Sequence, residues 1–198
     1  MRVVPARAGG FGAARVVGAS LSFKWGQTTH ATHATDVDAD GDVDILVADL
    51  EKGPVSSGSG AIYWYENDGA QTFGDTSRRE VHRPNTWERG VYALDLDGDG
   101  DVDVLTASYY TDTVAWYENH GNGTNWTYHV ISDRFPTRGA TGVRFGDIDL
   151  DGKMDVLAAS LGDMFIVWFD RDEANDAWDL VVVSDGVYGP YDTLPLDF

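Results

Sequence analysis

Short, mainly apolar runs recur along the chain, and turn-forming Gly, Asn and Asp residues separate them. Three runs are mainly aliphatic, at residues 45–48, 104–107 and 156–159. Three others are rich in aromatic residues, at residues 62–65, 114–117 and 166–169. No segment sustains the 3.6-residue period of an amphipathic helix, whereas short apolar runs bounded by turn residues are typical of buried strands. The pattern predicts an all-β chain.

The runs belong to a unit that occurs three times. In each unit a strand leads into an acidic segment, an aliphatic strand leaves it, an aromatic strand follows, and a last strand closes the unit. The acidic segments begin at Asp36, Asp95 and Asp147, which are 59 and then 52 residues apart. Hairpin turns are indicated at 67–69 and 119–121, where Asn and Gly tolerate positive φ. Four-stranded repeats of this length are typical of β-propeller blades, so we expect antiparallel blades.

The repeats divide the chain into five segments: residues 1–29, 30–90, 91–140, 141–185 and 186–198. The first is an N-terminal lead or the remnant of a degenerate blade, and the next three are blades. The last resembles the start of a truncated fourth repeat, with Asp197 in the place of Asp95 and Asp147. Three blades cannot close a ring. We therefore expect a partial propeller, which is a fragment of a longer one or one part of an oligomeric ring.

Each acidic segment has the form Asp-x-Asp-x-Asp-Gly-x-x-Asp. Alternate residues of a tight loop can point at one centre, and calcium takes six to eight oxygen ligands. Positions 1, 3, 5 and 9 would supply carboxylates, and position 7 its backbone carbonyl by analogy with known calcium loops. The candidate ligands are Asp36, Asp38, Asp40, Asp42, Asp44, Asp95, Asp97, Asp99, Asp101, Asp103, Asp147, Asp149, Asp151, Lys153 and Asp155. About three Ca²⁺ ions are predicted.

Other readings of the loops are weaker. An EF-hand needs Glu at position 12 and flanking helices, but Val47, Thr106 and Ala158 stand there, within strand-like runs. Magnesium prefers to keep water ligands, and zinc favours thiolate or imidazole ligands. The remaining alternative is an acidic turn solvated without metal. Repulsion among four or five carboxylates in nine residues, repeated three times, favours calcium over that alternative.

Composition adds strong negative charge. Fourteen Lys and Arg residues oppose 33 Asp and Glu residues, giving a net charge of −19. Fourteen of the 33 acidic residues lie in the three loops. Such a field repels nucleic acid and anionic membrane surfaces, so we expect neither as a partner. There is no cysteine, no apolar run long enough to insert in a membrane, and no convincing signal peptide in residues 1–23.

The acidic loop, the apolar strand after it and the Trp-Tyr-Glu-Asn runs at 64–67 and 116–119 together resemble the FG-GAP/VCBS repeat family. That family includes the calcium-bearing blades of the integrin α-chain propeller. The resemblance covers residues 30–185. It implies a calcium-binding, non-catalytic scaffold for protein or glycan binding and adhesion, in an extracellular or cell-surface location. Further blades of the same chain, or an oligomer, would complete the propeller.

Two alternatives to this function stay open. One is a calcium-dependent lectin that holds a sugar between blades, and the other is an accessory or catalytic domain of a carbohydrate-active enzyme. Glu66 and Glu118 could form a carboxylate pair, but no nucleophile motif accompanies them, so we expect no enzyme. We expect Trp64, Trp116 and Trp168 to pack between blades, because each sheet must bury its face against the next.

Overall fold

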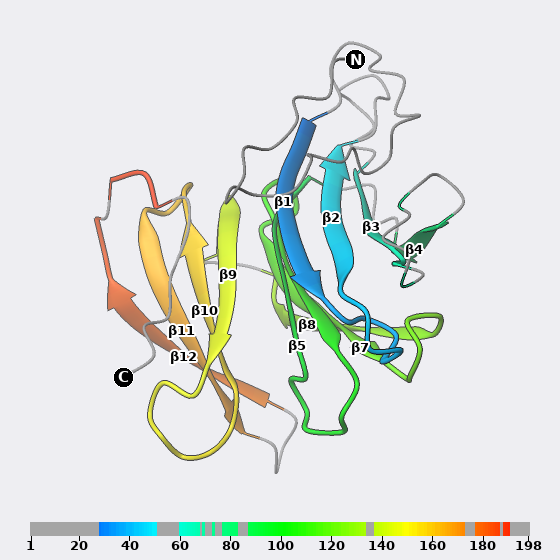
Figure 1. Cartoon of the computed structure of the whole chain (residues 1–198). Helices are drawn as coiled ribbons and strands as arrows, with labels where there is room; N and C mark the ends of the chain where they lie inside the picture. Colours follow the sequence, from blue (N-terminus) through cyan, green and yellow to red (C-terminus); the bar gives the residue numbers. More distant parts are fainter. Residues whose placement is uncertain are drawn as a thin grey trace, which may run out of the picture.

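The computed structural model describes residues 28–50, 60–67, 69, 73, 77–82, 87–133, 137–172, 177–186 and 188–190. These residues form three four-stranded antiparallel sheets, and the strand order in each follows the chain (Figure 1). The predicted all-β fold of propeller-type blades is therefore confirmed. Residues 1–27 of the expected N-terminal lead lie outside the described residues, and so does the expected fourth acidic loop at Asp197.

Each sheet is one blade. Blade 1 contains β1 (Thr28–Thr35), β2 (Asp44–Leu50), β3 (Gly60–Tyr65) and β4 (Arg78–His82). Blade 2 contains β5 (Glu88–Leu94), β6 (Asp103–Ser108), β7 (Thr113–Asn119) and β8 (Trp126–Ser132). Blade 3 contains β9 (Ala140–Gly146), β10 (Asp155–Ser160), β11 (Phe165–Asp172) and β12 (Ala177–Ser184).

The three blades share their register, including its irregularities. In each blade the first strand carries one extra residue near its start, and the last strand carries one near its end. The extra residues are His30, Arg89 and Thr141 in the first strands and Val81, Ile131 and Val183 in the last strands. A bulge bends its strand and increases the local twist. Because the bulges coincide, positions can be equated between blades directly from strand pairing.

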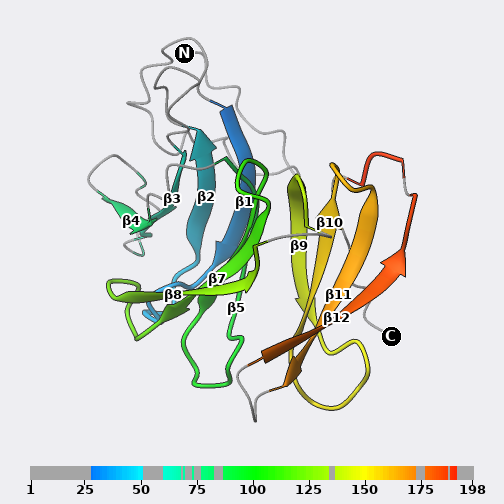
Figure 2. The same cartoon turned by 180° about the vertical axis from the view of Figure 1, so that it is seen from behind.

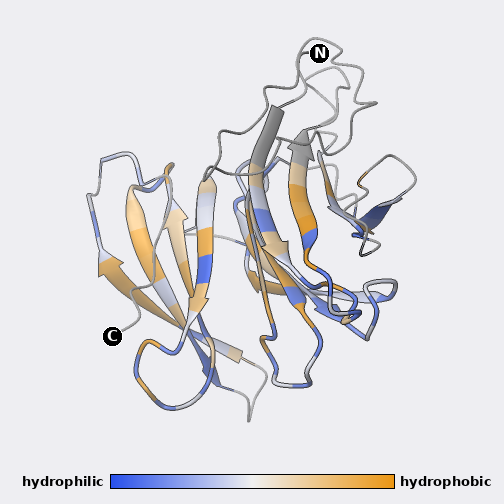
Figure 3. Ribbon diagram, viewed as in Figure 1, coloured by the Kyte–Doolittle hydropathy of each residue, from blue (hydrophilic) through white to orange (hydrophobic). Residues whose placement is uncertain are grey.

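The blades stand side by side and meet mainly through their first strands, with β1 against β5 and β5 against β9 (Figures 1 and 2). Apolar residues concentrate on the strands (Figure 3). Trp64 lies in a core cluster with Val91 and Val104 of blade 2, and Trp116 lies in one with Val143 and other residues of blade 3. These two tryptophans thus pack between blades, as expected.

Trp168 differs from its two counterparts. It is half-buried, whereas Trp64 and Trp116 are buried. Its sheet neighbour Leu157 is also half-buried, although the equivalent Leu105 is fully buried. The difference arises because this face of blade 3 is the one that, in blades 1 and 2, packs against the next blade.

Candidate functional site

The three acidic segments occupy one equivalent place in the fold. Loop 1 (residues 36–44) joins β1 to β2, loop 2 (95–103) joins β5 to β6, and loop 3 (147–155) joins β9 to β10. All three lie at the same end of the blades (Figure 1). Their ninth residue is in each case the first residue of the second strand. The repeat therefore places three copies of one acidic loop on one side of the molecule.

Each loop is held by hydrogen bonds from its own backbone to its own carboxylates. The N–H at position 6 donates to the Asp at position 1: Gly41 to Asp36 (2.9 Å), Gly100 to Asp95 (3.1 Å) and Gly152 to Asp147 (3.0 Å). The N–H at position 7 donates to the Asp at position 5: Asp42 to Asp40 (2.9 Å), Asp101 to Asp99 (2.8 Å) and Lys153 to Asp151 (2.9 Å). These bonds curl the chain so that carboxylates converge.

Two residues of every loop have left-handed backbone conformations. At position 6, Gly41, Gly100 and Gly152 have φ of 97°, 99° and 90°. A Cβ atom added to any of these glycines would meet no atom within 4 Å, so backbone conformation and not space requires glycine there. The other left-handed residue stands at position 4, where only loop 2 has a glycine.

Carboxylates gather in each loop closely enough to hold a metal ion. In each group, oxygen atoms lie within 4.8 Å of one another. The groups are Asp36, Asp38 and Asp40; Asp95, Asp97 and Asp99; and Asp147, Asp149 and Asp155. The structure thus brings nine of the fifteen predicted residues together. Asp42, Asp44, Asp101, Asp103, Asp151 and Lys153 lie outside these groups, and their contribution to a metal site stays a prediction.

Loop 3 differs from the other two because Lys153 stands at position 7. Its ammonium group lies 2.8 Å from the Asp151 carboxylate. The side-chain hydrogen bond from Lys153 lowers the pKa of Asp151. The exposed Asp151 is thereby paired with Lys153, and Asp155 takes its place in the oxygen group of loop 3.

The ninth residue of each loop is a buried carboxylate that ties the loop to the blade. Asp44 and Asp103 each accept two backbone hydrogen bonds. One comes from position 2 of the same loop (2.9 Å in both), and the other comes from Asn67 (2.8 Å) or Asn119 (2.9 Å), next to the third strand or at its end. Burial raises the pKa of Asp44 to about 6 and that of Asp103 to about 7, although the backbone bonds act in the opposite direction.

Asp155 is the third buried carboxylate, and it is less well satisfied. Its Oδ2 accepts the N–H of Ile148 at 2.8 Å, and burial raises its pKa. The backbone N–H of Arg171 is a weak donor that lowers this pKa slightly, and Asp155 Oδ1 has no hydrogen bond of normal geometry among the described residues.

Sequence reasoning missed a contact that links loop 1 to blade 2 and loop 2 to blade 3. Asn119 Nδ2 of blade 2 donates to the Val37 carbonyl of loop 1 at 3.1 Å, and Arg171 Nη1 of blade 3 donates to the Leu96 carbonyl of loop 2 at 2.9 Å. Asn119 and Arg171 are equivalent, since they pair with Trp126 and Trp178 in their sheets. We call them the clamp residues. Among the described residues, none donates a side-chain hydrogen bond to the corresponding carbonyl of loop 3.

Together, propeller-type blades with acidic loops between their first two strands define a repeat module with candidate metal sites. The sequence pattern of the FG-GAP-like repeat matches residues 36–106 and 95–158, more than half of the chain. The chain belongs to this family, and the predicted resemblance is confirmed. Each match begins at the first Asp of a loop. No curated protein sequence matches the chain significantly. No helix within the described residues has the length and apolar character needed to cross a membrane.

Proposed function

We propose that this chain is a calcium-binding propeller module that acts as a non-catalytic scaffold for binding and adhesion at the cell surface or outside the cell. The observation that carries the proposal is the threefold recurrence of a carboxylate oxygen group at one place in the blade. A single acidic turn is common on protein surfaces, but the same hydrogen-bonded loop in three blades indicates a shared ligand.

Calcium suits these loops better than other cations. The groups offer only oxygen atoms, and calcium accepts six to eight of them in flexible geometry. Magnesium requires near-ideal octahedral geometry and retains water, and zinc favours nitrogen and sulfur ligands. In the proposed sites, the carbonyls of Asp42, Asp101 and Lys153 and the carboxylates at position 9 complete the shell around the gathered aspartates.

The proposed role of the metal is structural. A cation would offset part of the negative charge of each loop and fix the start of the second strand against the end of the first, within a chain of net charge −19. Blade faces and inter-strand loops would then present a binding surface for a protein or glycan partner. An extracellular location is consistent with this role, since extracellular calcium modules bind with dissociation constants of about 10⁻⁴–10⁻³ M.

We expect calcium to raise the melting temperature of the purified chain and magnesium to raise it far less. At a free calcium concentration 100 times the dissociation constant, each site adds about 2.7 kcal/mol to the free energy of unfolding, because the unfolded chain does not preserve the site. Differential scanning calorimetry in calcium, in magnesium and in chelator measures the difference. Equal melting temperatures in all three solutions would rule out calcium as the ligand.

The calcium effect should also depend on pH. Because the pKa values of Asp44 and Asp103 are raised to about 6 and about 7, the folded metal-free chain holds protons that the unfolded chain releases near pH 4. The contribution of these two groups to the free energy of unfolding of the metal-free chain therefore falls as pH rises from about 4 to 7. A cation can replace these protons. We expect the calcium-induced rise in melting temperature to grow between pH 5 and pH 7.5, and a constant rise would contradict this account.

A further inference from the structure

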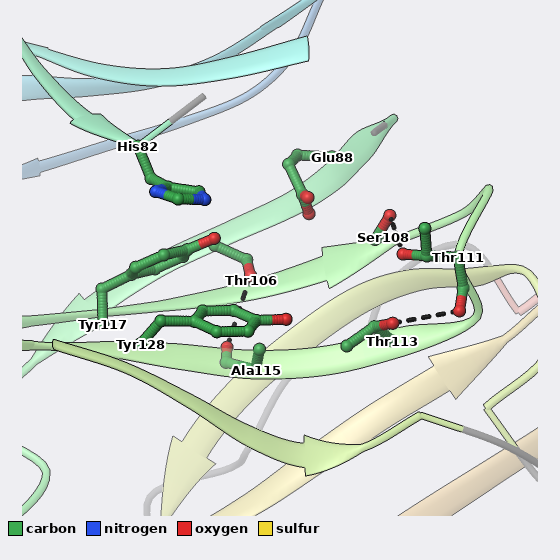
Figure 4. Close-up of a pocket in the computed structure, with 9 residues that line it drawn as sticks. All are labelled: His82, Glu88, Thr106, Ser108, Thr111, Thr113, Ala115, Tyr117 and Tyr128. Atoms are coloured by element: carbon green, nitrogen blue, oxygen red, sulfur yellow. Dashed lines mark hydrogen bonds between the residues drawn. The ribbon is translucent and has the colours of Figure 1, made fainter. Parts of the chain in front are cut away.

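A cavity of about 230 Å³ lies between blade 1 and blade 2. His82 of β4 forms one wall, and residues of β5, β6, β7 and β8 form the others (Figure 4). Its lining on β6 is Thr106 and Ser108, whereas loop 2 ends at Asp103 at the other end of the same strand. The cavity is therefore separate from the acidic loops and from the proposed calcium sites.

The lining is rich in oxygen atoms. It contains the carboxylate of Glu88 and six hydroxyl groups, which belong to Thr106, Ser108, Thr111, Thr113, Tyr117 and Tyr128. Glu88, Thr106 and Ser108 are no more than 3% exposed, so the floor is both polar and buried. Figure 4 shows the Glu88 carboxylate and the two tyrosine hydroxyls directed toward the same space. Polar groups buried in this way usually serve a ligand, ordered water or a local bond.

Blade 3 shows that the fold does not need most of these polar groups, although it keeps a buried serine, Ser160, at the position of Ser108. Strand pairing equates Glu88, Thr106, Thr113, Ala115, Tyr117 and Tyr128 with Ala140, Ala158, Phe165, Val167, Phe169 and Leu180. Several of these blade 3 residues belong to the apolar core between blades 2 and 3. The same face of the same repeat is thus a solid apolar interface in one place and a polar cavity in the other. Packing alone does not explain the cavity.

The mouth of the cavity is aromatic. The ring planes of His82 and Tyr128 are nearly parallel, at an angle of 9° with centroids 5.9 Å apart, and Tyr128 is about half exposed. Tyr117 lies deeper and is buried. Burial, and then the negative charge of Glu88, raise the pKa of Tyr117, so its hydroxyl stays protonated and can donate a hydrogen bond. The site therefore combines ring faces at the entrance with donors and acceptors inside.

These features select a class of ligand. The Glu88 carboxylate repels anions. Three hydroxyls already donate within the wall, Thr106 to the Ala115 carbonyl (3.4 Å), Thr111 to Ser108 (2.8 Å) and Thr113 to the Thr111 carbonyl (3.0 Å). Each hydroxyl oxygen can still accept a hydrogen bond, and an apolar molecule would offer it no donor. Hydroxyl groups both donate and accept, so they match a ligand whose own groups do the same, and aromatic faces pack against its C–H surfaces. The cavity is smaller than the roughly 300–1,000 Å³ of sites for drug-sized ligands. We propose that this cavity binds one neutral sugar residue, either free or at the end of a glycan.

This inference rests on the proposed binding role and specifies its ligand class. The test uses the whole chain in calcium and free glucose, galactose, mannose and N-acetylglucosamine as probes. Saturation-transfer NMR detects binding, and titration calorimetry measures it. Ala115→Val fills the cavity with the residue that blade 3 has at that position, Val167, and Tyr128→Phe removes one hydroxyl from the mouth. Tyr110→Phe is the matched control, because Tyr110 is 64% exposed and lies outside the cavity.

We expect at least one probe to bind with a dissociation constant of about 1 mM or lower. Ala115→Val should weaken that binding roughly tenfold or more by removing space. Tyr128→Phe should weaken it by roughly two- to tenfold, the worth of one hydrogen bond, and Tyr110→Phe should leave it unchanged. Circular dichroism and melting in calcium confirm that each variant folds.

Three results would overturn the sugar site. They are no binding by any probe, binding that Ala115→Val does not change, and binding of tetramethylammonium in preference to the sugars, which would mark a cation site. The calcium-induced rise in melting temperature is measured on the same samples. If it persists without sugar binding, only the cavity inference fails, whereas its loss would remove the calcium module itself.

Discussion

Asp103→Ala will destabilise the metal-free chain by several kcal/mol, although it removes a carboxylate from a crowded acidic loop. The Asp103 side chain is fully buried and accepts the backbone N–H groups of Leu96 and Asn119. Each buried N–H left without an acceptor costs about 1–3 kcal/mol, so the loss is about 2–6 kcal/mol. The whole free energy of unfolding of a domain is only about 5–15 kcal/mol, so this loss is a large part of it. Urea unfolding in chelator measures the change.

Two controls separate this structural role from calcium binding. Asp99→Ala removes an exposed carboxylate of the same loop, together with the exposed hydrogen bond that it accepts from Asp101. Because water can replace that acceptor, the change should lower stability in chelator much less than Asp103→Ala does, but it should abolish the calcium response of loop 2. Asp103→Asn keeps one acceptor oxygen and the side-chain shape, and should fall between the two. If Asp103→Ala and Asp99→Ala were equally stable in chelator, position 9 would have no structural role beyond metal binding.

Asn119→Ala will weaken calcium binding at loop 1, which belongs to a different blade. The Asn119 side chain is buried and donates to the carbonyls of Val37 in loop 1 (3.1 Å) and Val102 in loop 2 (3.2 Å). Its removal deprives the loop 1 backbone of this hydrogen bond to blade 2, while the packing of Val37 against blade 2 remains. The expected loss is roughly two- to tenfold in affinity, which corresponds to one hydrogen bond of about 0.5–1.5 kcal/mol.

NMR can follow the loops separately. The amide signals of Gly41 and Gly152, at position 6 of loops 1 and 3, should report each site during a calcium titration. Asn119→Ala should shift the midpoint of the Gly41 response to a higher calcium concentration and leave the midpoint at Gly152 unchanged. Asn125→Ala, an exposed asparagine on the same turn, is the control. An equal shift at both glycines would show general destabilisation and would count against the clamp.

The sequence predicted what is local and repeated. The spacing of Asp36, Asp38 and Asp40, with Gly41 after them, was enough to predict a loop whose carboxylates converge, because the loop's own backbone bonds produce that shape. The strand order could be predicted for the same reason, since each strand pairs with its neighbour in the chain.

What the sequence did not reveal depends on which surfaces meet. Asn119 lies 82 residues from Val37, and nothing local marks it as a partner of loop 1. The buried state of Asp103 was also hidden, because the same Asp fits a ligand and a structural acceptor equally well. The cavity residues look like ordinary strand positions. Strand pairing makes Thr106 of blade 2 equivalent to Ala158 of blade 3, and this comparison shows that a face that is apolar in blade 3 is polar in blade 2.

Position 4 of the loops carries one further consequence. Ala39 and Leu150 adopt left-handed φ of 60° and 64°, and the same place in loop 2 is Gly98 with φ of 80°. Loops 1 and 3 therefore store about 1–2 kcal/mol of backbone strain in the folded state. Loop 2 carries no such strain, but glycine gives its unfolded chain more conformational entropy to lose on folding. Formation of the same loop is thus opposed by backbone strain in blades 1 and 3 and by the loss of conformational entropy in blade 2. Warming should loosen loop 2 more steeply than the others, because an entropic opposition grows with temperature.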